Sequence, residues 1–300
     1  MCGLIHRYLT KLSIADFYFV RLVKQKIIMQ TPLMIAVAPN GARKTKADHA
    51  RLPILPSELA QTAEECLAAG CCMIHLHVRD ENAKHSLEPK NYRVAIEEIR
   101  NKVGNDLIIQ ITTEAVGIYQ PERQIEIVKE IRPEAASIAL REFCPNSGYE
   151  RQASEFFAWM FKERVAPQYI LYDLDDIRRF DEFCQRGMIP GENHSVLLVL
   201  GRYTVNQESN PDDLDLLIKD LPKNCNWWLC AFGKNETMCM ESVIKNQGHC
   251  RVGFENNHFL PDGEVAASNV DSIAIVNELA KKHARPLADA ELARELMSFP

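Results

Sequence analysis

The chain has 300 residues, of which 46% are hydrophobic and 25% are charged. This length and composition are typical of a globular protein with one large domain or two small ones, and they exclude a disordered or collagen-like chain. The formal net charge of −6 and the isoelectric point near 5.9 argue against nucleic acid or an anionic membrane as the main partner.

The first 28 residues do not resemble a targeting or membrane segment. Charged side chains interrupt their apolar runs at positions 11, 16, 21, 24 and 26. No run is therefore long enough to span a bilayer, and no small-residue cleavage site follows a clean apolar region. We expect residues 1–30 to be a loosely attached extension and residues 31–300 to form a single catalytic domain.

The ten cysteines are scattered along the chain without a CxxC pair. This pattern indicates free thiols in a reducing compartment, so we expect a cytoplasmic protein.

From Pro32 onward, short apolar runs alternate with amphipathic stretches, which is the sign of repeated βα units. The predicted strands are Leu33–Ala38, Cys72–Val78, Leu107–Thr112, Ala136–Leu140, Tyr169–Asp173, Ser195–Leu200, Trp227–Phe232 and Cys250–Glu255. The predicted helices are Pro56–Ala69, Pro89–Val103, Pro121–Ile131, Glu155–Val165, Ile177–Arg186, Pro211–Leu221, Glu236–Lys245 and Val270–Ala284. Gly70, Gly104 and Gly248 stand where helix C-caps are expected.

Eight βα units over this length predict an α/β fold of the (β/α)8 TIM-barrel type. A doubly wound sheet is the main competitor, but Asn40-Gly41-Ala42 after the first strand is too short and too polar for a dinucleotide fingerprint. The last segment, Ala288–Met297, is expected to form a short amphipathic helix that packs on the barrel or on a partner subunit.

Polar side chains gather where the predicted strands end, which is where barrel enzymes carry their chemistry. They include Asn40 and Arg43 after the first strand, His75 and His77 on the second, Thr112, Thr113 and Glu114 on the third, and Arg251, Glu255 and Asn256 on the eighth.

His75 and His77 alternate with apolar residues and therefore point to one face of their strand. The eighth strand closes the barrel beside the first and close to the second, so Glu255 can complete a His, His, Glu set around one divalent metal ion. The competing interpretation of Glu255 is an ion pair with Arg251.

Four motifs in this order resemble the β-keto acid cleavage enzyme family, whose best-known member is 3-keto-5-aminohexanoate cleavage enzyme. The similarity runs from about Pro32 to Arg285. The motifs are Ala38-Pro-Asn-Gly-Ala-Arg43, His75-Leu-His-Val-Arg-Asp80, Gln110-Ile-Thr-Thr113 and Arg251-Val-Gly-Phe-Glu255.

The resemblance implies a zinc enzyme that converts a 3-keto acid and acetyl-CoA into acetoacetate and a new acyl-CoA by Claisen and retro-Claisen steps. By the same resemblance, His75, His77 and Glu255 bind the zinc. Thr112 holds the carboxylate of the keto acid, and Arg251 belongs to the catalytic group. Asn40, Arg43 and Thr113 join Thr112 as expected substrate contacts. Homo-oligomers are usual for such barrels.

Two positions depart from the family pattern. Asn256 stands where the characterised member has an acid directly after the zinc-binding Glu. Either Asn256 orients substrate, or an acid such as Glu114 accepts the proton, or the reaction is altered. Arg43 stands where an acid recognises the substrate's amino group, which disfavours an ammonium substrate and suits an anionic tail such as that of a keto dicarboxylate.

Other functions remain open at this point. Amidohydrolases also use a His-x-His pair, but usually on the first strand. A different metal-dependent lyase or aldolase, or a non-catalytic protein that binds metal or acyl-CoA, would also fit. No Gly-rich phosphate loop marks the coenzyme site. Arg141, Arg202 and Lys234 lie near strand ends, but solvated surface charge is the simpler explanation for each.

Overall fold

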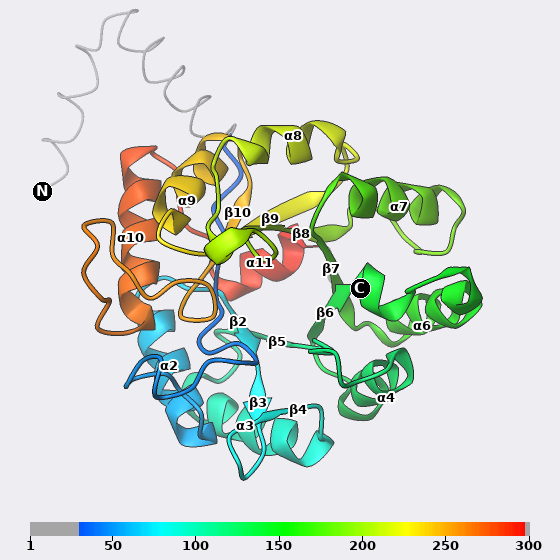
Figure 1. Ribbon diagram of the computed structural model, residues 1–300, viewed down its shortest axis with the longest axis horizontal. Helices are drawn as coiled ribbons and strands as arrows, with labels where there is room; N and C mark the ends of the chain where they lie inside the picture. The colour runs from blue at the N-terminus through cyan, green and yellow to red at the C-terminus, as the bar shows by residue number, and fades with distance from the viewer. Residues whose placement is uncertain (1–29, 298–300) are drawn as a thin grey trace, which may run out of the picture.

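The structure is a computed structural model that describes residues 30–297, and Figure 1 shows a barrel surrounded by helices. The predicted 1–30 extension lies outside the described residues except for residue 30. Eight parallel strands close the barrel, which confirms the predicted fold. They are β1 (Ile35–Val37), β2 (Met73–Leu76), β5 (Ile108–Ile111), β6 (Ala135–Ala139), β7 (Ala166–Leu171), β8 (Ser195–Leu200), β9 (Asn226–Ala231) and β10 (His249–Val252).

The helices follow the strands in alternation. They are α2 (Pro56–Ala68), α3 (Pro89–Val103), α4 (Pro121–Ile131), α5 (Leu140–Phe143), α6 (Glu150–Glu163), α7 (Leu174–Gln185), α8 (Asp213–Asp220), α9 (Glu236–Lys245), α10 (Asn269–Lys282) and α11 (Ala290–Leu296). The predicted bounds of α3, α4 and α9 agree with the structure.

Several predicted bounds differ from the structure by a few residues, and three differences have a clear local cause. The predicted strand Cys72–Val78 is broken after Leu76, because the chain leaves the barrel and forms a hairpin of β3 (Val78–Arg79) and β4 (His85–Ser86). Helix α7 begins before Ile177, since Asp173 caps it by accepting a hydrogen bond from the Asp176 amide. Gly248 is not a C-cap; the Trp227 ring packs within 2.2 Å of the place where a Cβ would stand.

Side chains of the barrel strands alternate between two apolar layers, as the two-residue period of a strand requires. On β8, Val196, Leu198 and Leu200 pack outward against the helices, while Leu197 and Val199 point into the barrel. Both layers are buried, which is why the strands appear in the sequence as continuous apolar runs.

Helix α11 fills the end of the barrel opposite the carboxyl ends of the strands. It lies within the ring of helices in Figure 1, and Ala290, Ala293 and Met297 pack against inward side chains such as Met73 and Trp228. The predicted helix therefore packs on the barrel. No helix within residues 30–297 is both long and apolar enough to cross a membrane.

Candidate active site at the carboxyl ends of the strands

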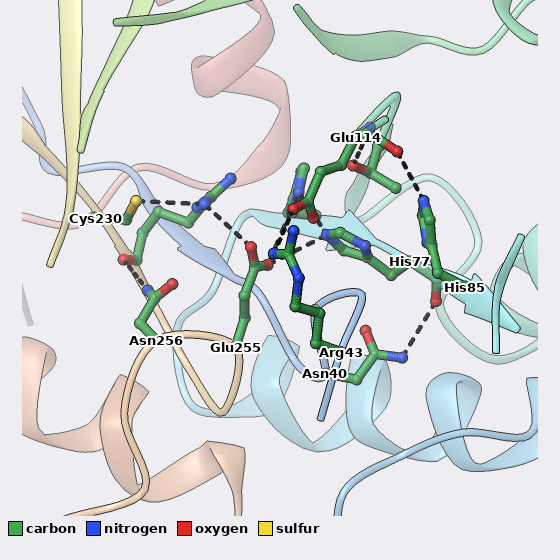
Figure 2. A network of polar contacts seen from close by, with 12 residues as sticks. Asn40, Arg43, His77, His85, Glu114, Cys230, Glu255 and Asn256 are labelled. Carbon is green, nitrogen blue, oxygen red and sulfur yellow. Dashed lines mark hydrogen bonds and ion pairs between the residues drawn. The ribbon is translucent and has the colours of Figure 1, made fainter. Parts of the chain in front are cut away.

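His75, His77 and Glu255 converge at one point of the barrel rim. The Nε2 atoms of His75 and His77 are 3.1 Å apart, and Glu255 Oε2 lies 3.9 Å from the first and 3.4 Å from the second. Figure 2 shows Glu255 directed toward His77. The convergence follows from strand order, because β1 pairs with both β2 and β10 and so brings the two motifs together.

Two glycines let the backbone come close to Glu255. A Cβ on Gly41 would stand 2.7 Å from Glu255 Cγ, and a Cβ on Gly253 would stand 2.7 Å from the Ala38 carbonyl oxygen. Both residues have positive φ angles, +61° and +131°, which side chains disfavour. The glycines therefore allow the turns after β1 and β10 to meet, and the Glu255 amide donates to the Ala38 carbonyl at 3.0 Å.

Arg251 sets the electrostatics of this cluster. Its Nη2 lies 3.5 Å from Glu255 Oε1 and 3.3 Å from Cys230 Sγ. Burial alone would raise the pKa of the Glu255 carboxyl, but the Arg251 guanidinium beside it holds that pKa well below its usual value. Burial and Arg251 also hold the pKa of His75 well below its usual value, so this ring is neutral. The ion pair and the convergent cluster, which the sequence presented as alternatives for Glu255, therefore occur together.

The three side chains fit a divalent metal ion. Their ligand atoms all lie within 4.8 Å of one another. Glu255 Oε2 is buried and has no hydrogen-bond partner among residues 30–297, so it is an acceptor directed at the point where the imidazole nitrogens meet. Two nitrogens and one carboxylate oxygen form a set that zinc accepts, with room for further ligands.

A line of buried side chains supports His75 from behind. His75 Nδ1 lies 2.7 Å from Gln110 Oε1, Gln110 Nε2 donates to Gln168 Oε1 at 3.2 Å, and Gln168 Nε2 donates to Ser195 Oγ at 3.2 Å. With Nδ1–H donating to Gln110, the lone pair of Nε2 is left free toward the cluster. The amides meet across β6 because its inward positions carry small side chains such as Ala135.

A cleft opens beside the cluster. Its lining residues are His75, Thr112, Glu114, Ile170, Tyr172, Val199, Arg202, Phe232, Arg251 and Glu255. Arg251 Nε and Nη1 are buried and lack partners among the described residues, so this cation is available to an anionic ligand. Ile170, Val199 and Phe232 supply an apolar wall.

Glu114 connects two arginines at the cleft. Arg43 Nη1 and Arg202 Nη2 donate to its Oε1 at 3.1 and 3.0 Å. Burial raises the pKa of the Glu114 carboxyl despite the nearby Arg43 guanidinium. Arg43 stands at the rim with 56% of its side chain exposed, and Figure 2 shows it reaching over the cluster toward Glu114.

The structure does not bring Asn40, Thr113 or Asn256 into the lining of the cleft. Asn40 donates to the backbone carbonyls of Pro53 and His77, and the Thr113 hydroxyl donates to the Ser137 carbonyl. Figure 2 shows Asn256 on the far side of Glu255 from His77, and its amide donates to the Arg251 carbonyl and to Glu236. Substrate contacts by these three residues stay predictions.

Several residues of the site were missed by sequence reasoning. Arg202, two residues after the end of β8, was interpreted from the sequence as solvated surface charge. That interpretation is wrong, because Arg202 lines the cleft and pairs with Glu114. Gln110 belongs to a recognised motif but was assigned no role. Glu236, whose pKa burial raises to about 8, begins α9 and gave no signal of its contact with Asn256.

Comparison with known proteins agrees with this site. Residues 32–299 match the family model of the beta-keto acid cleavage enzyme. The 3-keto-5-aminohexanoate cleavage enzyme of Fusobacterium nucleatum subsp. nucleatum is 29% identical over 280 residues, covering 90% of this chain and 99% of that protein. The 3-oxoadipate:acetyl-CoA acetyltransferase of Cupriavidus necator is 28% identical over 283 residues, covering 91% of this chain and 96% of that protein.

A solved structure supports the architecture. The apo structure of ObcA superposes with a TM-score of 0.66 and 13% identity, covering 83% of this chain and 65% of that one, which shows the fold alone. The family match extends over nearly the whole chain, so the chain belongs to the beta-keto acid cleavage enzyme family and is an enzyme that breaks a carbon–carbon bond.

Proposed function

We propose that this enzyme is a zinc-dependent β-keto acid cleavage enzyme that converts a 3-keto acid and acetyl-CoA into acetoacetate and an acyl-CoA. The observation that carries the proposal is the convergence of His75, His77 and Glu255 beside a cleft that contains the buried, partly unpaired Arg251. The names of relatives that transfer acetyl groups from acetyl-CoA support the same co-substrate.

His75, His77 and Glu255 would hold the ion. When bound, a divalent ion supplies a Lewis acid that stabilises negative charge on a keto oxygen. Gln110 fixes the tautomer of His75, and Arg251 keeps Glu255 ionised.

Arg251 and Thr112 are placed to bind the substrate carboxylate. The Thr112 oxygen accepts from the Glu114 amide at 3.1 Å, which leaves its hydroxyl hydrogen free to donate into the cleft. Arg251 offers two nitrogen donors in the same space. A guanidinium and a hydroxyl in a dry cleft hold a carboxylate by charge-assisted hydrogen bonds.

Glu114 is the proposed general base. It lines the cleft, whereas Asn256 does not, and burial raises its pKa, which makes its carboxylate a stronger base. It takes a proton from C2 of the keto acid, and the resulting enolate carbon attacks the acetyl carbonyl. The coenzyme A thiolate is then transferred from the former acetyl carbon to C3 of the keto acid. The bond between C3 and C2 breaks, which releases acyl-CoA, and protonated Glu114 returns its proton to C2 of the acetoacetate enolate.

The charge at the rim favours an anionic tail on the substrate. Arg43 and Arg202 both stand at Glu114, so the rim carries two cations against one carboxylate. A substrate ammonium group would be repelled there, while a second carboxylate would be attracted. We therefore propose a 3-keto dicarboxylate, a class to which the named substrate of the Cupriavidus necator relative belongs.

Metal analysis followed by a coupled assay tests the proposal. We expect about one zinc ion per chain, lost in Glu255→Gln, and acyl-CoA formation that is fastest with 3-keto dicarboxylates. Arg43→Gln should reduce the preference for dicarboxylates over uncharged keto acids. Amino-substituted keto acids as the best substrates would contradict the assigned tail, and a chain with neither zinc nor cleavage would contradict the function.

Three expectations accompany this proposal. We infer a single catalytic domain over residues 31–300 preceded by an attached extension, and a homo-oligomeric assembly. The nine cysteines within the described residues are free thiols, which supports a reducing, cytoplasmic environment.

A further inference from the structure

A second groove opens next to the cleft, between the ends of β7 and β8 and helix α8. Its walls include Leu174, Leu200, Tyr203, Leu216 and Leu217. The groove encloses about 360 Å³, which is more than the cleft encloses. It is lined mainly by apolar and aromatic groups, as small-molecule sites usually are.

The groove and the cleft are adjacent. Tyr172, Val199 and Arg202 line both of them. A ligand whose reactive end lies in the cleft would reach the groove by passing along these three side chains.

Two large apolar side chains of the groove are exposed. Tyr203 is 69% exposed and Leu216 is 62% exposed. The rings of Tyr203 and Tyr172 are packed with their centroids 5.1 Å apart, so Tyr203 is supported by a neighbour that also lines the cleft. Apolar side chains gathered beside a reaction site indicate a ligand that covers them.

The charged side chains of the groove favour the uncharged pantetheine arm of a coenzyme A thioester over its phosphates. Its charged side chains are Asp173, Asp213 and Arg202. Arg202 is already bonded to Glu114, and the nearby Arg141 to Asp173 and Asp176. Because both cations are already paired with carboxylates, the groove offers phosphates little attraction, whereas Asp173 and Asp213 offer acceptors to amide N–H groups. The pantetheine arm is uncharged, has apolar methylene segments and carries two amides.

We propose that this groove holds the pantetheine arm of the acetyl-CoA co-substrate and leads its thioester into the cleft, while the phosphates and the nucleotide lie outside the groove. This inference rests on the proposed function, because it names where that co-substrate binds. It goes beyond it by assigning α8 and Tyr203, which have no part in the metal site, to recognition of the acyl donor.

Thioesters of three lengths test the assignment. Acetyl-CoA contains the arm and the nucleotide, acetylpantetheine contains only the arm, and S-acetyl-N-acetylcysteamine contains only its first segment. Leu216→Trp fills the groove at an exposed position, and Tyr203→Ala removes part of its wall. The matched control is Leu55→Trp, since Leu55 is 57% exposed and does not line the groove.

We expect each groove variant to raise KM about tenfold for acetyl-CoA and acetylpantetheine, and to leave KM for S-acetyl-N-acetylcysteamine and for the keto acid unchanged. Calorimetric titration with acetylpantetheine should show the same loss of affinity without turnover. Leu55→Trp should behave as wild type in both measurements.

Other outcomes overturn the inference. An effect confined to acetyl-CoA would assign the groove to the nucleotide or phosphates. An equal effect on all three thioesters would place the disturbance in the cleft, and unchanged KM and affinity would remove the groove from donor binding. Failure of the proposed function is distinct, because wild type would then cleave no keto acid with any thioester, whereas the titration still reports on the groove.

Discussion

Gln110 is a neutral side chain that orients one ligand of the proposed metal site. Its Oε1 accepts a hydrogen bond from His75 Nδ1–H, and its Nε2 donates one to Gln168 Oε1. We predict that Gln110→Leu lowers zinc affinity by about 10–100-fold, because the buried Nδ1–H of His75 loses its acceptor and the ring is no longer fixed. Competition with a chromophoric chelator measures this change.

Gln124→Leu is the matched control for that variant. Gln124 is also fully buried, but it donates to the Thr113 carbonyl and to Glu142 and does not touch His75. We expect this variant to lower stability and leave zinc affinity unchanged. Equal zinc affinity in the Gln110 and Gln124 variants would show that the line of amides does not orient His75.

Glu236 makes stability depend on pH. Burial raises the pKa of its carboxyl to about 8 in the folded chain, so between its ordinary pKa of 4.5 and pH 8 the folded state holds a proton that the unfolded state has released. Stability is therefore lost as pH rises through this window, by up to about 1.4 kcal/mol per pH unit. We predict that Glu236→Gln becomes progressively more stable relative to wild type from pH 5 to pH 8, measured by urea unfolding. Parallel curves for the two proteins would contradict the raised pKa.

The loop after β1 depends on a glycine at position 41. Gly41→Ala places a Cβ 2.7 Å from Glu255 Cγ at a φ of +61°. We predict that it destabilises the fold by about 1–2 kcal/mol from the backbone conformation and, in addition, weakens zinc binding by displacing Glu255. Thermal unfolding and metal titration measure the two effects separately.

Gly104→Ala is the control that separates the cost of the backbone conformation from the displacement of Glu255. Gly104 has a similar φ of +56°, and a Cβ there would meet no atom within 4 Å among the described residues. It should show the stability loss alone. A Gly41→Ala chain with wild-type zinc affinity would mean that the turn after β1 does not position Glu255.

The predicted starts of α3 and α4 are confirmed, and both carry an explicit start signal; the same signal at Pro211 placed the start of α8 two residues too early. Pro89 and Pro121 stand in the first turns of α3 and α4, where a missing N–H does no harm. Helix α6 begins at Glu150 instead of Glu155, because its first turn is polar and adds nothing to the apolar period. Helix α7 begins early because Asp173 acts as its cap, a role that the sequence alone could not distinguish from the end of a strand.

Helix α11 closes one end of the barrel, and we call it the floor of the barrel. Ala293 is fully buried among the inward side chains of the barrel, so Ala293→Glu would bury a carboxylate without a partner. We predict a destabilisation of about 3–5 kcal/mol, from overpacking and the desolvated charge. Chemical denaturation measures it. Ala158→Glu at an exposed position of α6 is the control and should change stability by less than about 0.5 kcal/mol; a similar small loss at position 293 would show that the floor is not closed.

The sequence by itself was enough to predict the (β/α)8 barrel and the three candidate metal ligands. Alternation within a strand places His75 and His77 on one face, and cyclic closure of eight strands brings Glu255 beside them. Both arguments use only the order of residues along the chain and the two-residue period of a strand.

Only the tertiary structure decided which polar residues share the cleft. Asn256 immediately follows Glu255 in the sequence, yet its side chain is turned toward Glu236, while Arg202 reaches Glu114 from a strand end that carried no recognised motif. Gln110 and Gln168 meet because β6 between them carries small inward side chains. The physical reason is that these contacts depend on loop backbone angles and on side-chain volumes across the barrel, which neither residue order nor local periodicity specifies.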